Sequence, residues 1–267
     1  MMRWPTILAI IASCLIATTG AKAAEICTLI ADGKSGAVLM ERGDCHTPVT
    51  PASTFKVPLA VMGYDAGFLT APDAPVLDFQ EGYPDWIAEW RRPTDPAAWM
   101  RHSVVWYSQR ITQALGAERL SAYAAAWGYG NADFSGDPGF DNGLERAWIA
   151  SSLQVSPVEQ VRFLHGLVNR TLPVSAAAMD MTVAIVEGHS AGEWSVRGKT
   201  GSAFPRLADR SFDRSRAWGW YVGWATKGER SVVFARLNQD EQRTEGPSGI
   251  RARGGFLAEL PGLMAGL

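Results

Sequence analysis

The stretch Pro51-Ala52-Ser53-Thr54-Phe55-Lys56-Val57-Pro58-Leu59 places a hydroxyl and an amine three residues apart, among small and apolar neighbours. In a helix, residues three apart lie on one face about a turn apart, so Ser53 and Lys56 can share a proton. Pro51 interrupts the incoming chain and puts Ser53 near a helix N-terminus, where free N–H groups stabilise developing negative charge. A nucleophilic serine with a lysine partner is built in this way. Because roughly one S-x-x-K is expected by chance in such a chain, an ordinary helix start is the alternative.

A second informative triplet, Lys199-Thr200-Gly201, follows Gly198. A lysine and a hydroxyl on an edge strand, beside a glycine that admits a substrate backbone, suit binding of a carboxylate next to an acylated serine. Only five of the 25 basic residues are lysine. Since a desolvated lysine can lose its proton and an arginine cannot, lysine at positions 56 and 199 indicates amine chemistry. The alternative is a basic turn between strands.

Hydrophobic periodicity predicts the fold class. Helical patterns cover residues 54–66, 104–115, 117–127, 156–169 and 175–186, with another helix opened by Asp95-Pro96 and a last one from Arg253 to the C-terminus. Short aromatic or β-branched runs at 195–198, 217–225 and 231–237 predict antiparallel strands. With more strands near the N-terminus, we predict an α/β (α+β) fold. In the predicted fold, an antiparallel sheet formed from both chain ends is flanked by helices, and an all-helical lobe is inserted between the strands.

A β-hairpin is expected near the N-terminus, where apolar runs at 26–30 and 37–41 flank Asp32-Gly33-Lys34-Ser35-Gly36. Cys27 and Cys45 would fall near its open end. In an oxidising compartment an even pair of cysteines favours a disulfide, and two reduced, unrelated cysteines are the alternative.

The first 23 residues have the pattern of a secretory signal peptide. Arg3 is followed by an apolar run at 7–17, and Ala21-Lys22-Ala23 fits the small-x-small cleavage rule. We therefore expect residues 1–23 to be a signal peptide, residues 24–267 to form a single catalytic domain, and the mature protein to be periplasmic. A lipoprotein signal at Cys14 is a weaker alternative, since little apolar sequence precedes it. No later stretch has the length of a membrane span.

Composition limits the partners. Without Arg3 and Lys22 the 25 basic residues become 23 against 27 acidic residues, a formal charge of about −4. This balance gives no indication of a nucleic-acid or anionic-membrane partner. The chain has no C-x-x-C, and its four histidines lack ligand spacing, so no metal site is expected.

The motifs as a set resemble one family. S-x-x-K followed much later by K-T-G resembles the serine penicillin-recognising enzymes. Between these motifs stand Ser103-Val104-Val105 with Trp106, then Tyr129-Gly130-Asn131 and Trp148. This order is similar to that of class D β-lactamases (oxacillinases) over essentially the whole mature chain. The resemblance implies the β-lactamase/penicillin-binding transpeptidase-like fold and hydrolysis of β-lactam antibiotics.

The resemblance also implies catalytic roles. Ser53 would be the acylated nucleophile, and Lys56, N-carboxylated by CO₂, the general base. Ser103 would relay a proton to the leaving nitrogen, and Val105 would shield the modified lysine. Trp148 would donate its indole N–H to the carbamate, although core packing is the commoner fate of a tryptophan. An amine among Phe55 and other apolar groups has a lowered pKa, which independently favours a neutral Lys56.

For substrate binding, the resemblance implies that Lys199 and Thr200 orient the substrate carboxylate beside Gly201. The backbone N–H groups of Ser202 and of the nucleophile would form the oxyanion hole. A late arginine would also bind the carboxylate; Arg253, expected at the start of the last helix, fits best, with Arg251 as the alternative.

Tyr129-Gly130-Asn131 would be a structural motif rather than the catalytic Y-x-N of class C enzymes. Ser103 is also expected to begin a helix as its N-cap.

Three other classes of protein share parts of this motif set. A penicillin-binding signal receptor domain would be acylated without turnover, but tends to have a polar residue where Val105 lies. A D,D-peptidase would usually carry S-x-N in place of S-x-V, and a non-catalytic binding module is hard to reconcile with both lysines. Beyond the CO₂-derived group we expect no cofactor, a small-molecule β-lactam as the partner, and a monomer or weak dimer.

Overall fold

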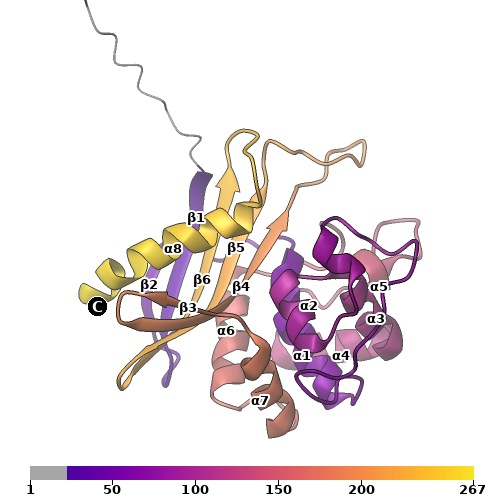
Figure 1. The fold of residues 1–267 in the computed structure, drawn as a ribbon. Coiled ribbons are helices and arrows are strands. Elements are labelled where there is room, and N and C mark those ends of the chain that lie inside the picture. Colours follow the sequence, from indigo (N-terminus) through magenta and orange to yellow (C-terminus); the bar gives the residue numbers. More distant parts are fainter. Residues whose placement is uncertain (1–22) are drawn as a thin grey trace, which may run out of the picture.

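The computed structural model describes residues 23–267 (Figure 1). The expected signal peptide lies outside the described residues except for Ala23, which begins the first strand. Among residues 23–267, no helix combines the length and apolar character needed to cross a bilayer. The elements in chain order are β1 (Ala23–Asp32), β2 (Val38–Gly43), the 3-10 turn η1 (Ala52–Phe55), α1 (Lys56–Asp65), the 3-10 turn η2 (Ala88–Arg91), α2 (Pro96–His102), α3 (Val105–Leu115), α4 (Ala117–Trp127), α5 (Gly143–Arg146), α6 (Pro157–Val168), α7 (Ala176–Ile185), β3 (Gly188–Ala191), β4 (Trp194–Ala203), β5 (Trp218–Lys227), β6 (Arg230–Asp240) and α8 (Ser248–Ala265).

The described strands form one antiparallel sheet in the order β2-β1-β6-β5-β4-β3. The N-terminal strand β1 lies between β2 and the late strand β6, which confirms a sheet built from both chain ends. The short strand β3 was not predicted. It pairs only with Trp194–Arg197 of β4, so the outer edge of β4 is open from Lys199 onward among the described residues.

Helices cover both faces of the sheet (Figure 1). The helix α8 lies across one face, and α6 packs on the other, beside the lobe of helices α1 to α5. Side chains alternate between the two faces along each strand. In β1, Leu29 and Ala31 join the core shared with the helical lobe, whereas Ile30 joins the smaller core under α8. The helices α1 to α5, which lie between the N-terminal and C-terminal strands in the sequence, form the predicted inserted helical lobe, and that prediction is confirmed.

Local signals explain where several helices begin. Ser156 and Glu159 form the predicted capping box of α6, with Pro157 at the first helical position. The side chain of Asp95 accepts the Ala98 N–H at the start of α2. The last helix begins at Ser248, so Arg253 lies in its second turn and not at its start as predicted.

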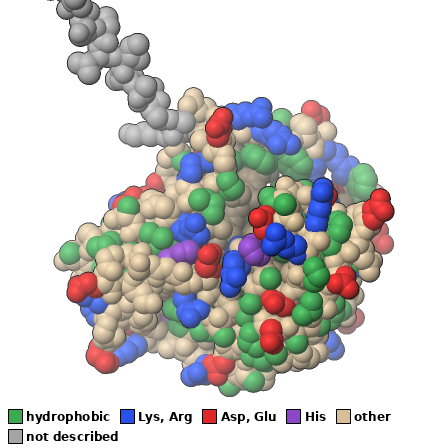
Figure 2. Space-filling view, viewed as in Figure 1, with side chains coloured by type: hydrophobic (Ala, Val, Ile, Leu, Met, Phe, Trp, Pro, Cys, Tyr) green, Lys and Arg blue, Asp and Glu red, His purple; other side chains and the backbone are tan. Residues whose placement is uncertain are grey.

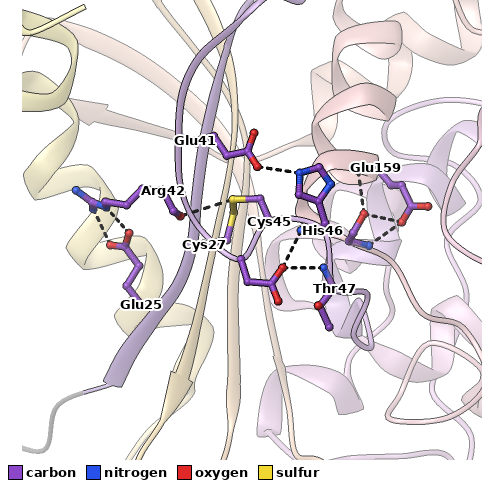
Figure 3. The surroundings of a disulfide bond; sticks show 10 residues. Glu25, Cys27, Glu41, Arg42, Cys45, His46, Thr47 and Glu159 are labelled. Atoms are coloured by element: carbon purple, nitrogen blue, oxygen red, sulfur yellow. Dashed lines mark hydrogen bonds and ion pairs between the residues drawn. A yellow bond between two sulfur atoms is a disulfide. The ribbon is translucent and has the colours of Figure 1, made fainter.

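The predicted disulfide joins Cys27 of β1 to Cys45 just after β2 (Figure 3). Both residues are fully buried, and their Cα atoms are 5.1 Å apart. Nearby, Arg42 forms a bidentate ion pair with Glu25, which joins the same two strands. The bond therefore closes the open end of the N-terminal hairpin.

Candidate active site

Ser53 and Lys56 lie where η1 passes into α1, on the side of the helical lobe that faces β4. Ala52 has a φ of 51°, and this left-handed turn directs the chain into the helix. Lys56 is fully buried, and its Nζ lies 3.4 Å from Ser53 Oγ. Burial, and then the charge of Lys199, place the pKa of Lys56 well below its usual value. The shift favours the neutral amine, which can accept a proton or react as a nucleophile.

Ser103 lies opposite this pair, between α2 and α3. Its Oγ accepts a hydrogen bond of 3.0 Å from Lys199 Nζ of β4, which connects the helical lobe to the sheet. The prediction that Ser103 caps the start of a helix was wrong. It ends α2 in the left-handed region (φ 58°), and α3 begins at Val105, which is buried. This turn lets the serine side chain reach Lys199.

Lys199 is 5% exposed. Burial lowers its pKa to about 8; the carboxylate of Glu187 opposes this shift, and the charge of Arg253 adds to it. Near neutral pH the ammonium is still charged, and it also contacts the carbonyl oxygen of Thr200 at 3.2 Å. A buried cation on a strand with an open edge suits the binding of an anionic group.

Gly201 explains how closely β4 approaches the Ser53 turn. A Cβ atom there would lie 2.9 Å from the Pro51 carbonyl oxygen and 3.1 Å from Thr54 Cγ2, so a side chain would force the turn away. Beside it, Ser202 Oγ accepts a hydrogen bond of 2.9 Å from the Gly249 N–H of α8. The K-T-G strand is thus held between the Ser53 turn and the last helix.

Trp148 packs beside the Ser53 turn. Its ring stacks on Phe55 with centroids 5.6 Å apart, and the residue is almost completely buried. Thr50 fixes the backbone around it: the Thr50 hydroxyl donates to the Trp148 carbonyl and accepts the Ala150 N–H, both at 2.9 Å. The Trp148 indole N–H makes no hydrogen bond to another group within residues 23–267. This free donor lies on a ring that stacks against Phe55, the residue before Lys56.

The two candidate arginines differ in their surroundings. Arg251 pairs with the buried carboxylate of Asp240 and donates to the carbonyls of Glu245 and Gly246. Arg253 instead lies 3.6 Å from the Glu187 carboxylate, close enough to Lys199 to lower the pKa of that lysine. Figure 2 shows basic and histidine side chains across the middle of the face where the sheet meets the helical lobe. Of the two arginines, only Arg253 lies beside the lysine of K-T-G.

Tyr129-Gly130-Asn131 makes structural contacts. The buried Tyr129 hydroxyl donates to the Gln160 side-chain oxygen, and the Gln160 amide donates to Thr54, next to Ser53. Asn131 donates to the Ser152 carbonyl and accepts the Gln154 N–H. Burial raises the pKa of Tyr129, so its hydroxyl stays protonated. The motif therefore fixes the loop after Trp148 and supports the Ser53 turn.

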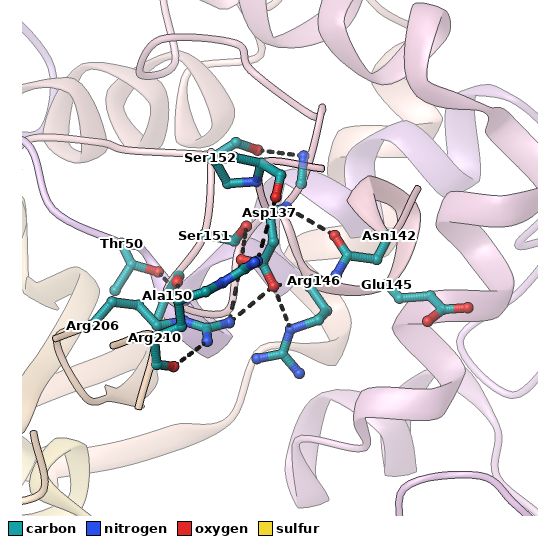
Figure 4. Close-up of polar contacts among 12 residues, drawn as sticks. Thr50, Asp137, Asn142, Glu145, Arg146, Ala150, Ser151, Ser152, Arg206 and Arg210 are labelled. Atoms are coloured by element: carbon teal, nitrogen blue, oxygen red, sulfur yellow. Dashed lines mark hydrogen bonds and ion pairs between the residues drawn. The ribbon is translucent and has the colours of Figure 1, made fainter. Parts of the chain in front are cut away.

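One polar cluster near the site was not predicted (Figure 4). The Asp137 carboxylate lies 2.9 Å from Arg206 Nη2 and accepts a hydrogen bond from the Ser151 hydroxyl at 2.8 Å. Arg206 also donates to the Ala150 carbonyl at 3.2 Å. Asp137 and Arg206 are 69 residues apart, so no local pattern announces the pair. The cluster joins the loop between β4 and β5 to the segment that follows Trp148.

Comparisons with known proteins agree with this geometry. A family model described as penicillin binding protein transpeptidase domain matches residues 26–259. Beta-lactamase OXA-9 of Klebsiella pneumoniae is 45% identical over 240 residues, covering 89% of this chain and 88% of that protein. The crystal structure of OXA-427 class D β-lactamase is 44% identical, with a TM-score of 0.83, and the match covers 90% of this chain and 98% of that one. Regulatory protein BlaR1 of Bacillus licheniformis is 26% identical over 79% of this chain and 32% of its own length. The chain therefore belongs to the class D serine β-lactamases, on the penicillin-binding transpeptidase-like fold.

Proposed function

We propose that this protein hydrolyses β-lactam antibiotics through an acyl-enzyme on Ser53, with N-carboxylated Lys56 as the general base. The observation that carries the proposal is the fully buried amine of Lys56, with its lowered pKa, at 3.4 Å from Ser53 Oγ. A serine needs such a partner, because its hydroxyl is a weak nucleophile at its free pKa. The β-lactamase relatives support the same substrate class.

Acylation forms a bond between Ser53 Oγ and the β-lactam carbonyl carbon and breaks the ring C–N bond. The serine proton leaves toward the base at Lys56, and the ring nitrogen gains a proton from the Ser103 hydroxyl. Ser103 then regains a proton from that base, so that both groups return to their starting state. Lys199, which donates to that hydroxyl at 3.0 Å, stabilises the transient alkoxide on Ser103. The backbone N–H groups of Ser53 and Ser202 stabilise the negative carbonyl oxygen. A water molecule then gives a proton to the base at Lys56 and its oxygen bonds to the ester carbonyl carbon. The bond from that carbon to Ser53 Oγ breaks, Oγ takes the proton back from the base, and the opened acid leaves.

The surroundings of Lys56 fit a CO₂-derived carboxyl group. Burial lowers the pKa of the amine, and its sole hydrogen bond within residues 23–267 is the long one to Ser53. The free indole N–H of Trp148 is a donor with no acceptor function, which suits a buried anion. We assign to the buried Val105 the exclusion of water from this group. When CO₂ has added to the amine, the resulting carbamate supplies a general base beside Ser53.

The substrate carboxylate binds to Lys199 and Thr200 at the open edge of β4, with Arg253 completing the site. Arg251 is the weaker choice, because its guanidinium already neutralises the Asp240 carboxylate. Gly201 lets this strand lie close against the Ser53 turn, which keeps the carboxylate ligands near the serine.

Two features support export to the periplasm. The sequence of residues 1–23 has the pattern of a signal peptide, and the Cys27–Cys45 disulfide is typical of an oxidising compartment. We expect the mature enzyme to act there as a monomer or weak dimer.

Hydrolysis of a chromogenic cephalosporin by the mature protein, with and without bicarbonate, tests the proposal. We expect repeated turnover that increases with bicarbonate. A stoichiometric burst without turnover would instead indicate a penicillin receptor, which the partial match to BlaR1 makes the relevant alternative. Absence of any reaction would rule out both functions.

A further inference from the structure

A small polar and charged cluster lies near Lys199 of the carboxylate site. It consists of Glu187, His189 and Arg253. Arg253 Nη1 lies 3.6 Å from Glu187 Oε2 and 3.3 Å from His189 Nε2, and the same histidine nitrogen lies 3.6 Å from Glu187 Oε2. These contacts join the segment that begins β3 to the second turn of α8.

The backbone fixes Glu187 next to the K-T-G strand. Its carbonyl oxygen accepts the Gly198 N–H at 3.2 Å, directly before Lys199. The hairpin of β3 and β4 follows, with Gly188 paired to Arg197. Glu187 therefore stands at the point where β3 stops covering β4, beside the open edge that we assign to the substrate carboxylate.

Arg253 needs such a restraint. A free arginine side chain samples many rotamers, and ordering it for binding costs conformational entropy. Within residues 23–267, Glu187 provides the only carboxylate within ion-pair distance of Arg253. Arg251, one α-helical half-turn earlier, is directed away by Asp240. Among the described carboxylates, that of Glu187 is therefore the one placed to hold Arg253 near Lys199, and His189 Nε2 lies close to both side chains.

We propose that Glu187 is a positioning residue, whose carboxylate holds the guanidinium of Arg253 beside Lys199 to complete the substrate-carboxylate site. This inference rests on the proposed function, because it assigns a role within the same site. Glu187 does not touch the substrate; it acts through Arg253.

The same carboxylate affects the charge of Lys199. The groups that face this ammonium are Lys56, Ser103, Glu187 and Arg253, and among the charged ones only Glu187 raises the pKa of Lys199. Removing its charge lets burial and Arg253 lower that pKa further. The alkaline limb of the pH profile should then move to lower pH, which loss of a purely structural contact would not cause.

The test compares Glu187→Gln with wild type in the full mature protein, using benzylpenicillin and its methyl ester. For the free acid we expect KM to rise about 5- to 20-fold with little change in kcat, as loss of ground-state orientation predicts. The ester, which lacks the carboxylate, should show no such change. Glu187→Asp should recover part of the loss.

Glu193→Gln is the matched control, because Glu193 lies on the same hairpin and pairs with the exposed Lys227. It should leave both substrates and the pH profile unchanged. If Arg253 stayed in place, removing an acidic group nearby would strengthen anion binding. This electrostatic effect would lower KM for the free acid, whereas loss of positioning raises it. A lower or unchanged KM for the free acid, with wild type active, would therefore overturn the inference. Failure of wild type itself to hydrolyse benzylpenicillin would overturn the proposed function instead.

Discussion

Replacing Lys56 by methionine should stabilise the protein while removing its activity. The lysine side chain is fully buried, and its amine has one long hydrogen bond, to Ser53. Methionine has a similar length and an unbranched, adaptable side chain, so it can occupy the same space without a polar group. The substitution therefore removes a desolvation cost and keeps the packing.

The size of the effect follows from that burial. A buried polar group without adequate partners costs about 1–3 kcal/mol in mutational data. We expect the free energy of unfolding of Lys56→Met to rise by this amount at neutral pH without CO₂, which corresponds to about 2–10 °C in Tm. Loss of a general base should lower kcat/KM by about 10²- to 10⁴-fold.

The pH dependence has a definite sign. Because the pKa of Lys56 is lower in the folded protein, the unfolded chain binds the additional proton between the folded and unfolded pKa values. Wild type therefore loses stability as pH falls through this window, by up to about 1.4 kcal/mol per pH unit. The advantage of Lys56→Met should grow as pH decreases from about 10 toward neutral.

Thermal and urea unfolding in degassed buffer, repeated with bicarbonate, would measure these effects. Bicarbonate should stabilise wild type, because CO₂ binds only the folded site, and should leave Lys56→Met unchanged. Lys34→Met is the control: its side chain is exposed, and its stability should change by no more than about 0.5 kcal/mol. A Lys56→Met protein less stable than wild type, or one equally stabilised by bicarbonate, would refute the reasoning.

Three further perturbations test other parts of the structure. Asp137→Asn removes the charge of a nearly buried carboxylate 2.9 Å from Arg206. The free energy of unfolding, measured in urea, should therefore fall by about 1–3 kcal/mol. An unchanged value would contradict a supporting role for this cluster. Replacing Cys27 and Cys45 by serine opens a link between residues 18 apart and should cost about 3 kcal/mol, a loss that reducing agent should reproduce in wild type but not in the variant. Because the pKa of Lys199 is about 8, its charge disappears as pH rises through this value, and kcat/KM for free-acid penicillins should fall there; a profile that stays flat well above it would argue against Lys199 as the carboxylate ligand.

Elements with a strong local signal could be predicted from the sequence. The helix behind Ser156 and the paired strands β5 and β6 are examples, because capping chemistry and β-branched or aromatic runs act within a few residues. The strand β3 could not be predicted in this way. Its four residues, Gly188–Ala191, have little intrinsic β-preference and form a strand only because β4 is available for pairing.

Tertiary contacts also explain the other differences. The last helix begins before Arg253 because Gly249 is fixed against Ser202 of β4, a contact that outweighs the low helix propensity of glycine. The left-handed turn at Ser103 reflects its bond to Lys199. In the site, short motifs identified the residues near the nucleophile, whereas Glu187 became evident only when β3 placed it beside Arg253.

The central claim is that Ser53 is acylated and then released. Intact-protein mass spectrometry during reaction with benzylpenicillin tests it most directly, with Ser53→Ala as the control. The account predicts a transient mass increase equal to one penicillin on wild type, return to the original mass as substrate is consumed, and no adduct on the variant. A permanent adduct, or an adduct that also forms on Ser53→Ala, would contradict it.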